Sequence, residues 1–146
     1  MSDERVPDAP PPAAGGPSAG PTPRGEVVVL NRDLFFGIRI VNTLRARGFA
    51  VTLLPTTERL VERLQDGAAP PVLAMIDLGA ALDWDVLRPI LADPALTTPT
   101  LAFGPHKDVA AMRAAKAAGV TRLVSNGELH RDLVGLVERY ARSAPD

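Results

Sequence analysis

Cysteine is absent from the 146-residue chain, and only two histidines are present. The lack of thiols excludes disulfide scaffolds, zinc–thiolate centres and cysteine catalysis, and two histidines are too few for a histidine-rich metal centre. Long hydrophobic runs are missing as well. The longest, at 27–30 and 72–76, are far shorter than the roughly 20 residues that a membrane-spanning helix needs. No basic-then-apolar leader precedes them, so we expect a cytoplasmic protein that does not enter a membrane.

An excess of charge of one sign is missing too. The chain has 16 Lys+Arg and 17 Asp+Glu, which gives a formal net charge of −1. Nucleic acids and anionic membranes are held largely by positive charge, so neither is expected as a partner. The sequence also contains no Gly-x-Gly-x-x-Gly, no Gly-Lys-Ser/Thr loop and no Gly-x-Ser-x-Gly elbow between a predicted strand and helix. Dinucleotide binding, nucleotide triphosphate binding and serine hydrolase chemistry therefore have no support.

The N-terminal segment differs in composition from the rest. Residues 1–25 hold 7 of the 15 prolines and 4 of the 12 glycines, and too little apolar surface to offset the entropy lost on ordering. We predict a disordered tail, which acts as a tether or docking peptide through the prolines at 10–12, or is a solvated leader without a partner. Residues 26–142 are then expected to form one domain and 143–146 a short C-terminal tail, with no output domain.

Beyond residue 25, short β-branched runs alternate with helical patterns. Strands are expected at 27–30, 50–54, 72–76, 100–103 and 122–124, and helices at 33–47, 57–66, 84–92, 107–118 and 127–142. The strand runs are continuously apolar, which is typical of strands covered on both faces. Five successive βα units predict an α/β fold: a doubly wound, five-stranded parallel sheet of strand order 2-1-3-4-5, with helices on both faces.

Local signals mark the ends of several predicted helices. Gly48, Gly67 and Gly119 each lie just past a helix, where a left-handed residue commonly ends it. Ser125 and Glu128 have the spacing of a capping box ahead of the last helix.

The residues that follow the strand ends form the predicted pocket. In the order 2-1-3-4-5 the switch point lies between the first and third strands, and ligands bind outside their carboxyl ends. Asp77 directly follows the apolar third strand, where a carboxylate is costly unless it is solvated, paired or coordinated. It either has a chemical role, or only accepts hydrogen bonds from loop amides, Arg32 or Asn126. The other pocket residues are Asn31, Arg32, Asp33, Gly104, His106, Ser125 and Asn126.

These residues, with Ala118-Gly119 before the last strand, make the chain resemble a CheY-like response-regulator receiver domain. In that family an acidic pair after strand 1 and a phospho-accepting aspartate after strand 3 hold Mg²⁺. A Ser or Thr after strand 4 and a Lys after strand 5 bind the phosphoryl oxygens. The resemblance implies that Asp77 occupies the acceptor position. It places the acidic pair on Asn31 and Arg32, the hydroxyl on Gly104 and the lysine on Asn126.

Only the aspartate of that signature is kept, and each loss has a chemical meaning. Mg²⁺ needs hard oxygen ligands, and Arg32 puts a cation where the metal would sit. Gly104 lacks the hydroxyl, and Asn126 lacks the ammonium that would clamp a phosphoryl group. The resemblance therefore indicates a pseudo-receiver, which keeps the fold without the phosphorylation chemistry.

Three hypotheses for the function follow. The first is a stand-alone, non-enzymatic pseudo-receiver of bacterial signalling without a cofactor. It binds a protein partner or a second copy of itself through the helices at 107–118 and 127–142, and Arg32 and Asp77 form a structural ion pair. The second is a phosphorylatable receiver in a two-component phosphorelay, with the phosphoryl group on Asp77 and an Mg²⁺ held by Asp33 and Asp77 with help from Asn31. The third is an enzyme or small-ligand sensor that uses His106 and Ser125.

Aromatic residues near the pocket give two further expectations. Phe35 and Phe36 are adjacent, so one helix cannot bury both equally, and one should lie near the pocket mouth or at a contact surface. Trp84, the only tryptophan, is expected to pack under the short third helix rather than to mark a partner site.

Overall fold

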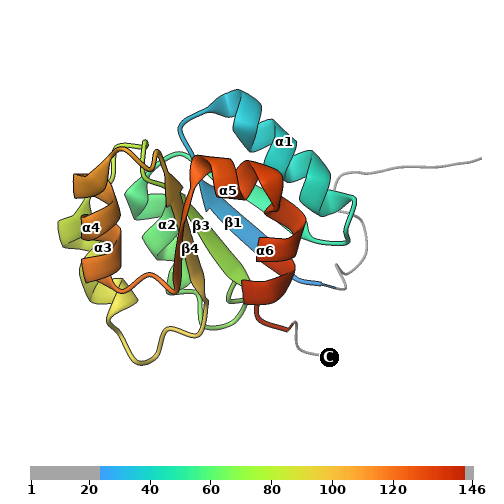
Figure 1. Cartoon of the computed structure of the whole chain (residues 1–146). Coiled ribbons are helices and arrows are strands. Elements are labelled where there is room, and N and C mark those ends of the chain that lie inside the picture. Colours follow the sequence, from blue (N-terminus) through green and yellow to red (C-terminus); the bar gives the residue numbers. More distant parts are fainter. Residues whose placement is uncertain (1–23, 144–146) are drawn as a thin grey trace, which may run out of the picture.

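The strands of the computed structural model, which describes residues 24–143, form one parallel sheet (Figure 1). They are β1 (Glu26–Leu30), β2 (Ala50–Leu54), β3 (Leu73–Asp77), β4 (Thr100–Gly104) and β5 (Arg122–Ser125). Their order, β2-β1-β3-β4-β5, confirms the predicted topology. Most of the predicted N-terminal tail and of the segment 143–146 lies outside the described residues.

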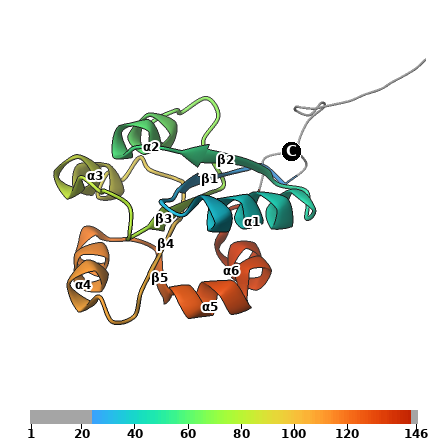
Figure 2. The same cartoon turned by 90° about the horizontal axis from the view of Figure 1, so that it is seen from above.

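Helices cover both faces of the sheet. They are α1 (Leu34–Arg45), α2 (Thr57–Leu64), α3 (Trp84–Leu91), α4 (Val109–Ala118), α5 (Asn126–Arg131) and α6 (Leu133–Tyr140). Figure 2 shows α1, α5 and α6 on one face and α2, α3 and α4 on the other. None of the helices in the described part of the chain has the length and apolar character needed to cross a bilayer.

The continuously apolar strands are explained by this two-sided cover. In β1, Val27 and Val29 belong to the core cluster under α1, α5 and α6, whereas Val28 and Leu30 belong to the cluster under α2, α3 and α4. All four are at most 1% exposed. Burying one such side chain contributes about 1.5–3 kcal/mol relative to leaving it in water. Both faces of the strand are therefore needed to hold the three layers together.

Helix α1 packs on the sheet through one stripe of side chains. Phe36, Ile40 and Leu44 are buried at four-residue spacing, as expected for one face of a helix. Phe36 meets Phe103 of β4 edge-to-face, with ring centroids 5.7 Å apart. This packing fixes which face of α1 remains in contact with solvent.

The C-terminal helix differs from its prediction. We expected one helix over 127–142, but the backbone leaves the helical region at Asp132 (φ −140°, ψ 41°), which separates α5 from α6. The carboxylate of Asp132 lies over Gly135, in space that any Cβ would occupy. The apolar stripe continues across the break, with Leu129, Leu133 and Leu136 all buried, so periodicity alone does not reveal it.

The glycines past the helices behave in two ways. Gly48 (φ 93°) and Gly119 (φ 94°) are left-handed, as predicted. The prediction for Gly67 is wrong, because Gly67 is not left-handed. The C-caps of α1 and α2 are the right-handed Ala46 and Gln65, whereas Gly119 is itself the C-cap of α4.

Candidate functional site

Asp77 ends β3, and main-chain amides engage both of its carboxylate oxygens. The N–H of Arg32 donates to Oδ2 at 2.9 Å, and the N–H of Gly79 donates to Oδ1 at 2.8 Å. Asp77 is 9% exposed. Hydrogen bonds to a charged acceptor contribute about 1.5–3 kcal/mol each, so these two stabilise a carboxylate at the end of a buried strand. The bond from Arg32 also joins the ends of β1 and β3, the two sides of the switch point.

The prediction of an ion pair between the side chains of Arg32 and Asp77 is wrong. None of the ion pairs found within residues 24–143 joins them. The guanidinium of Arg32 is exposed, and its Nη1 donates to the carbonyl of Gly79 at 3.4 Å. Bonding through the main-chain amide leaves the guanidinium in water and avoids the cost of burying it.

Asn31 and Asp33 are used to begin α1. Oδ1 of Asp33 accepts from the N–H of Phe35 at 2.9 Å and from that of Phe36 at 3.3 Å, which makes Asp33 the N-cap. Nδ2 of Asn31 donates to the main-chain carbonyl of Asp33 at 2.6 Å. The side chain of Asn31 lies against Gly37, in space that a Cβ would take.

This donor set does not fit an Mg²⁺ ion. Mg²⁺ requires an octahedral set of oxygen ligands and usually takes one or two carboxylates. Asp77 has both oxygens bonded to amides, and the carboxylate of Asp33 caps α1. Within residues 24–143, no group of three or more His, Cys, Asp or Glu side chains is placed to hold a metal ion.

Leu78 contacts the position where the resemblance expects a hydroxyl. A Cβ on Gly104 would lie 3.0 Å from Cβ of Leu78 and 3.3 Å from its Cδ1. Leu78 is buried in the core cluster under α2, α3 and α4. Sequence reasoning missed this residue. The signal for it was the register, because pairing of Asp77 with Phe103 brings Leu78 next to Gly104.

The remaining pocket residues do not converge on Asp77. Oγ of Ser125 accepts from the N–H of Glu128 at 3.1 Å and caps α5, which confirms the predicted cap. Asn126 is the first residue of α5, and His106 is exposed in the loop before α4. No hydrogen bond found among residues 24–143 joins any of the three to Asp77.

Apolar side chains are exposed beside this site, at the start of α1. Phe36 is 9% exposed and Phe35 is 86% exposed, so the expectation that only one of the two is buried is confirmed. Leu34 and Ile38 are 64% and 46% exposed. We call Leu34, Phe35 and Ile38 the α1 apolar patch. Sequence reasoning missed Leu34 and Ile38, although the buried stripe from Phe36 onward places them on the opposite face.

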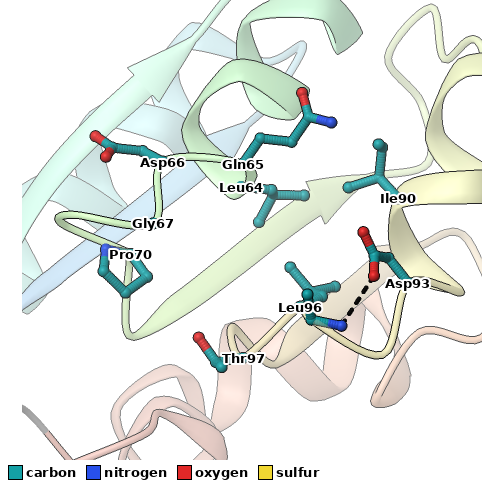
Figure 3. Close-up of a pocket in the computed structure, with 10 residues that line it drawn as sticks. Leu64, Gln65, Asp66, Gly67, Pro70, Ile90, Asp93, Leu96 and Thr97 are labelled. Atoms are coloured by element: carbon teal, nitrogen blue, oxygen red, sulfur yellow. Dashed lines mark hydrogen bonds between the residues drawn. The ribbon is translucent and has the colours of Figure 1, made fainter.

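A cavity of about 350 Å³ lies at the other edge of the sheet. It is lined by the C-terminal ends of α2 and α3 and the loops before β3 and β4, including Leu64, Ile90 and Leu96, with Asp66 and Asp93 (Figure 3). These segments precede the strands, whereas Asp77 follows one. The cavity therefore includes none of the predicted pocket residues.

No protein-family model and no curated protein sequence matches the chain. Solved structures do match. CheY4, a chemotaxis response regulator of Vibrio cholerae, matches with a TM-score of 0.66 and 14% identity, over 80% of this chain and 98% of that one. The phosphorylated cyanobacterial phytochrome response regulator RcpA matches with a TM-score of 0.66 and 17% identity, over 80% of this chain and 94% of that one.

A longer protein matches over part of its length. FixJ of B. japonicum is 20% identical with a TM-score of 0.65, over 80% of this chain and 57% of that one. CheY4 and RcpA are both response regulators. The chain therefore has the CheY-like receiver fold, with its five parallel strands in the order β2-β1-β3-β4-β5 and helices on both faces.

Proposed function

We propose that this chain is a non-enzymatic pseudo-receiver, which acts in bacterial signalling by binding another protein and takes no cofactor. The observation that supports this most directly is the bonding of Asp77. Its carboxylate is held by the main-chain amides of Arg32 and Gly79, and the side chains of Asp33 and Ser125 cap helices. Its place of action in this proposal is the cytoplasm.

Phosphoryl transfer to an aspartate needs charge compensation on the phosphoryl oxygens. The functional groups that would supply it are a metal ion, a hydroxyl and an ammonium. The positions that correspond to the hydroxyl and the ammonium carry Gly104 and Asn126, and the metal ligands are engaged elsewhere. The proposal therefore assigns Asp77 a structural role.

The second candidate is a phosphorylatable receiver in a two-component phosphorelay. It is favoured by one observation: an aspartate occupies the end of β3 in a fold whose neighbours include a phosphorylated response regulator. In that case Asp77 would have to release at least one amide bond before attack.

Intact mass separates the two candidates. The full chain is incubated with acetyl phosphate and Mg²⁺ beside a receiver known to be phosphorylated in this way. We expect the reference to gain one phosphoryl group and this chain to gain none. A gain that is present in the wild type and absent in Asp77→Asn would overturn the proposal in favour of the phosphorelay.

Fluorescence of Trp84 provides a second readout. Trp84 begins α3, is half-buried against the core, and lies a short loop away from Asp77. We expect no saturable change on titration with Mg²⁺ and then with beryllofluoride, a phosphoryl mimic. A saturable response that disappears in Asp77→Ala would support phosphorylation.

Self-association through α4 and the segment of α5 and α6 remains part of the proposal as a prediction. The exposed residues on α4 include Ala110 and Ala117, whose small side chains allow close approach of another helix. Sedimentation velocity across a range of protein concentrations tests it. A dimer whose dissociation constant rises when Ala110 and Ala117 are changed to Glu would support this surface.

A further inference from the structure

Helix α1 carries an apolar face that no other part of residues 24–143 covers. Its buried stripe is Phe36, Ile40 and Leu44, and the α1 apolar patch lies on the opposite side of the same helix. Of the four exposed large hydrophobic residues found among residues 24–143, three belong to this patch. The fourth, Val109, begins α4 and lies apart from them in the sequence. Contiguous exposed apolar residues of this kind mark interaction sites in folded proteins.

Positive charge predominates around the patch. Helix α1 contains Arg39 and Arg45 and no acidic residue, and Arg32 lies two residues before it. None of these three arginines is in an ion pair with a carboxylate of residues 24–143. The guanidinium of Arg39 donates to Nδ1 and to the carbonyl oxygen of His130, neither of which neutralises its charge.

Two carboxylates lie near this end of the helix, and main-chain amides donate to both: Asp77 accepts from Arg32 and Gly79. Oδ1 of Asp33 accepts the N–H groups of Phe35 and Phe36. The patch is therefore an apolar surface flanked by positive charge. A partner binds this surface more tightly when it buries apolar side chains against the patch and places its own carboxylates next to the arginines.

We propose that the α1 apolar patch binds a segment of another protein that carries apolar side chains flanked by Asp and Glu. This inference rests on the proposed function, in which protein binding is the output, and names the surface and the chemistry of the partner. Phe35 is the central anchor, since it is 86% exposed in the free chain and aromatic side chains dominate such contacts. Arg32, Arg39 and Arg45 provide attraction at the rim.

A second copy of the chain is a poorer occupant. Two α1 helices packed on each other would bring Arg39 and Arg45 of both copies to one interface with no acidic residue from α1. Like charges across an interface oppose association.

The test uses two synthetic peptides and the full ¹⁵N-labelled chain. Both peptides carry leucines at helical spacing, flanked by glutamates in one peptide and by lysines at the same positions in the other. We expect the acidic peptide to shift the amide signals of residues 32–39 saturably. We expect the basic peptide to bind at least about tenfold more weakly, because the arginines repel it.

Matched variants locate the contact. Phe35→Ser should weaken binding of the acidic peptide about tenfold, as expected for a central anchor. Arg39→Gln and Arg45→Gln should weaken it a few-fold and reduce its dependence on salt. Val109→Ser changes an exposed apolar residue outside the patch and should leave binding unchanged. Phe35 and Val109 are both exposed, so neither change disturbs the core.

Four results would overturn the inference: equal binding of both peptides, no saturation by either one, signal shifts centred away from α1, or equal weakening by Val109→Ser. Signals of α1 that change with protein concentration alone would assign the patch to a second copy instead. The acetyl phosphate experiment is independent of these results. A phosphorylated Asp77 would overturn the proposed function, whereas a failed peptide titration would overturn only the assignment of the surface.

Discussion

The main-chain N–H of Arg32 donates to Oδ2 of Asp77 at 2.9 Å, while the guanidinium of Arg32 stays in solvent. The contact between these two residues therefore depends on the backbone after β1 and on the side chain at position 77. It does not depend on the identity of residue 32. This asymmetry leads to the first of four predictions.

Arg32→Ala should leave the free energy of unfolding within about 0.5 kcal/mol of the wild type, as expected for an exposed side chain. Asp77→Asn should lower it by about 1–3 kcal/mol, because the new NH₂ group faces one of the two amide donors and leaves it unpaired. Urea unfolding followed by circular dichroism measures both. If Arg32→Ala costs as much as Asp77→Asn, the guanidinium is part of the contact after all.

Gly104→Ala should destabilise the chain by about 1–3 kcal/mol, because its Cβ is crowded by Leu78. The cost should shrink when Leu78 is changed to Gly, since the added methyl group then meets neither Cβ, at 3.0 Å, nor Cδ1, at 3.3 Å. A double-mutant cycle in urea gives the coupling energy between the two positions. Strictly additive effects would show that Leu78 does not limit the space at position 104.

Asp33→Ala should cost about 0.5–2 kcal/mol, the usual loss when an N-cap is removed. Asp33→Asn is the matched control and should retain most of the stability, since its side-chain oxygen still accepts from Phe35 and Phe36. Thermal unfolding with and without Mg²⁺ provides the readout. An increase of Tm by Mg²⁺ that both variants abolish would assign Asp33 to a metal site instead.

The fourth prediction concerns how the contribution of Glu138 to stability changes in acid. The hydrogen bond from Arg24 is the largest cause that lowers the pKa of Glu138 below its usual 4.5, and the charge of Arg24 adds to it. A carboxyl whose pKa is lower in the folded state stabilises the fold above its usual pKa. That contribution is lost as the pH falls through the lowered pKa.

The measurement for Glu138 is the difference in Tm between the wild type and Glu138→Gln. We expect a small advantage of the wild type at pH 7 and low ionic strength, which disappears in acid. Both side chains are partly exposed, so salt should reduce the difference. An advantage that persists below the lowered pKa would mean that packing of the side chain, and not its charge, is responsible.

The fold could be predicted from the sequence because it depends on burial. Strands covered on both faces must be apolar throughout, and β1 and β3 meet that condition. The break at Asp132 could not be predicted, since it arises from a carboxylate lying over Gly135 while the apolar stripe continues unchanged.

The sequence predicts where the site lies in the fold, but only partly which atoms make its contacts. Parallel strands bring their carboxyl ends to one edge, which is why Asn31, Arg32 and Asp77 lie at the same edge of the sheet. The sequence does not show which atoms meet there. Whether Arg32 bonds through its main chain or its guanidinium depends on the local path of the backbone. The crowding of Gly104 by Leu78 depends on strand register.

A contact made by backbone amides has a consequence for how such sequences are interpreted. The amide of Arg32 is available whatever side chain other than proline stands there, so this position is free to drift while the aspartate keeps its role. Position 79 is less free, because a Cβ on Gly79 would lie 3.1 Å from Oδ1 of Asp77. The contribution of Asp77 to folding is sufficient reason for it to be retained. An aspartate at this position is therefore not diagnostic of phosphotransfer, and the side chains around it are the better guide.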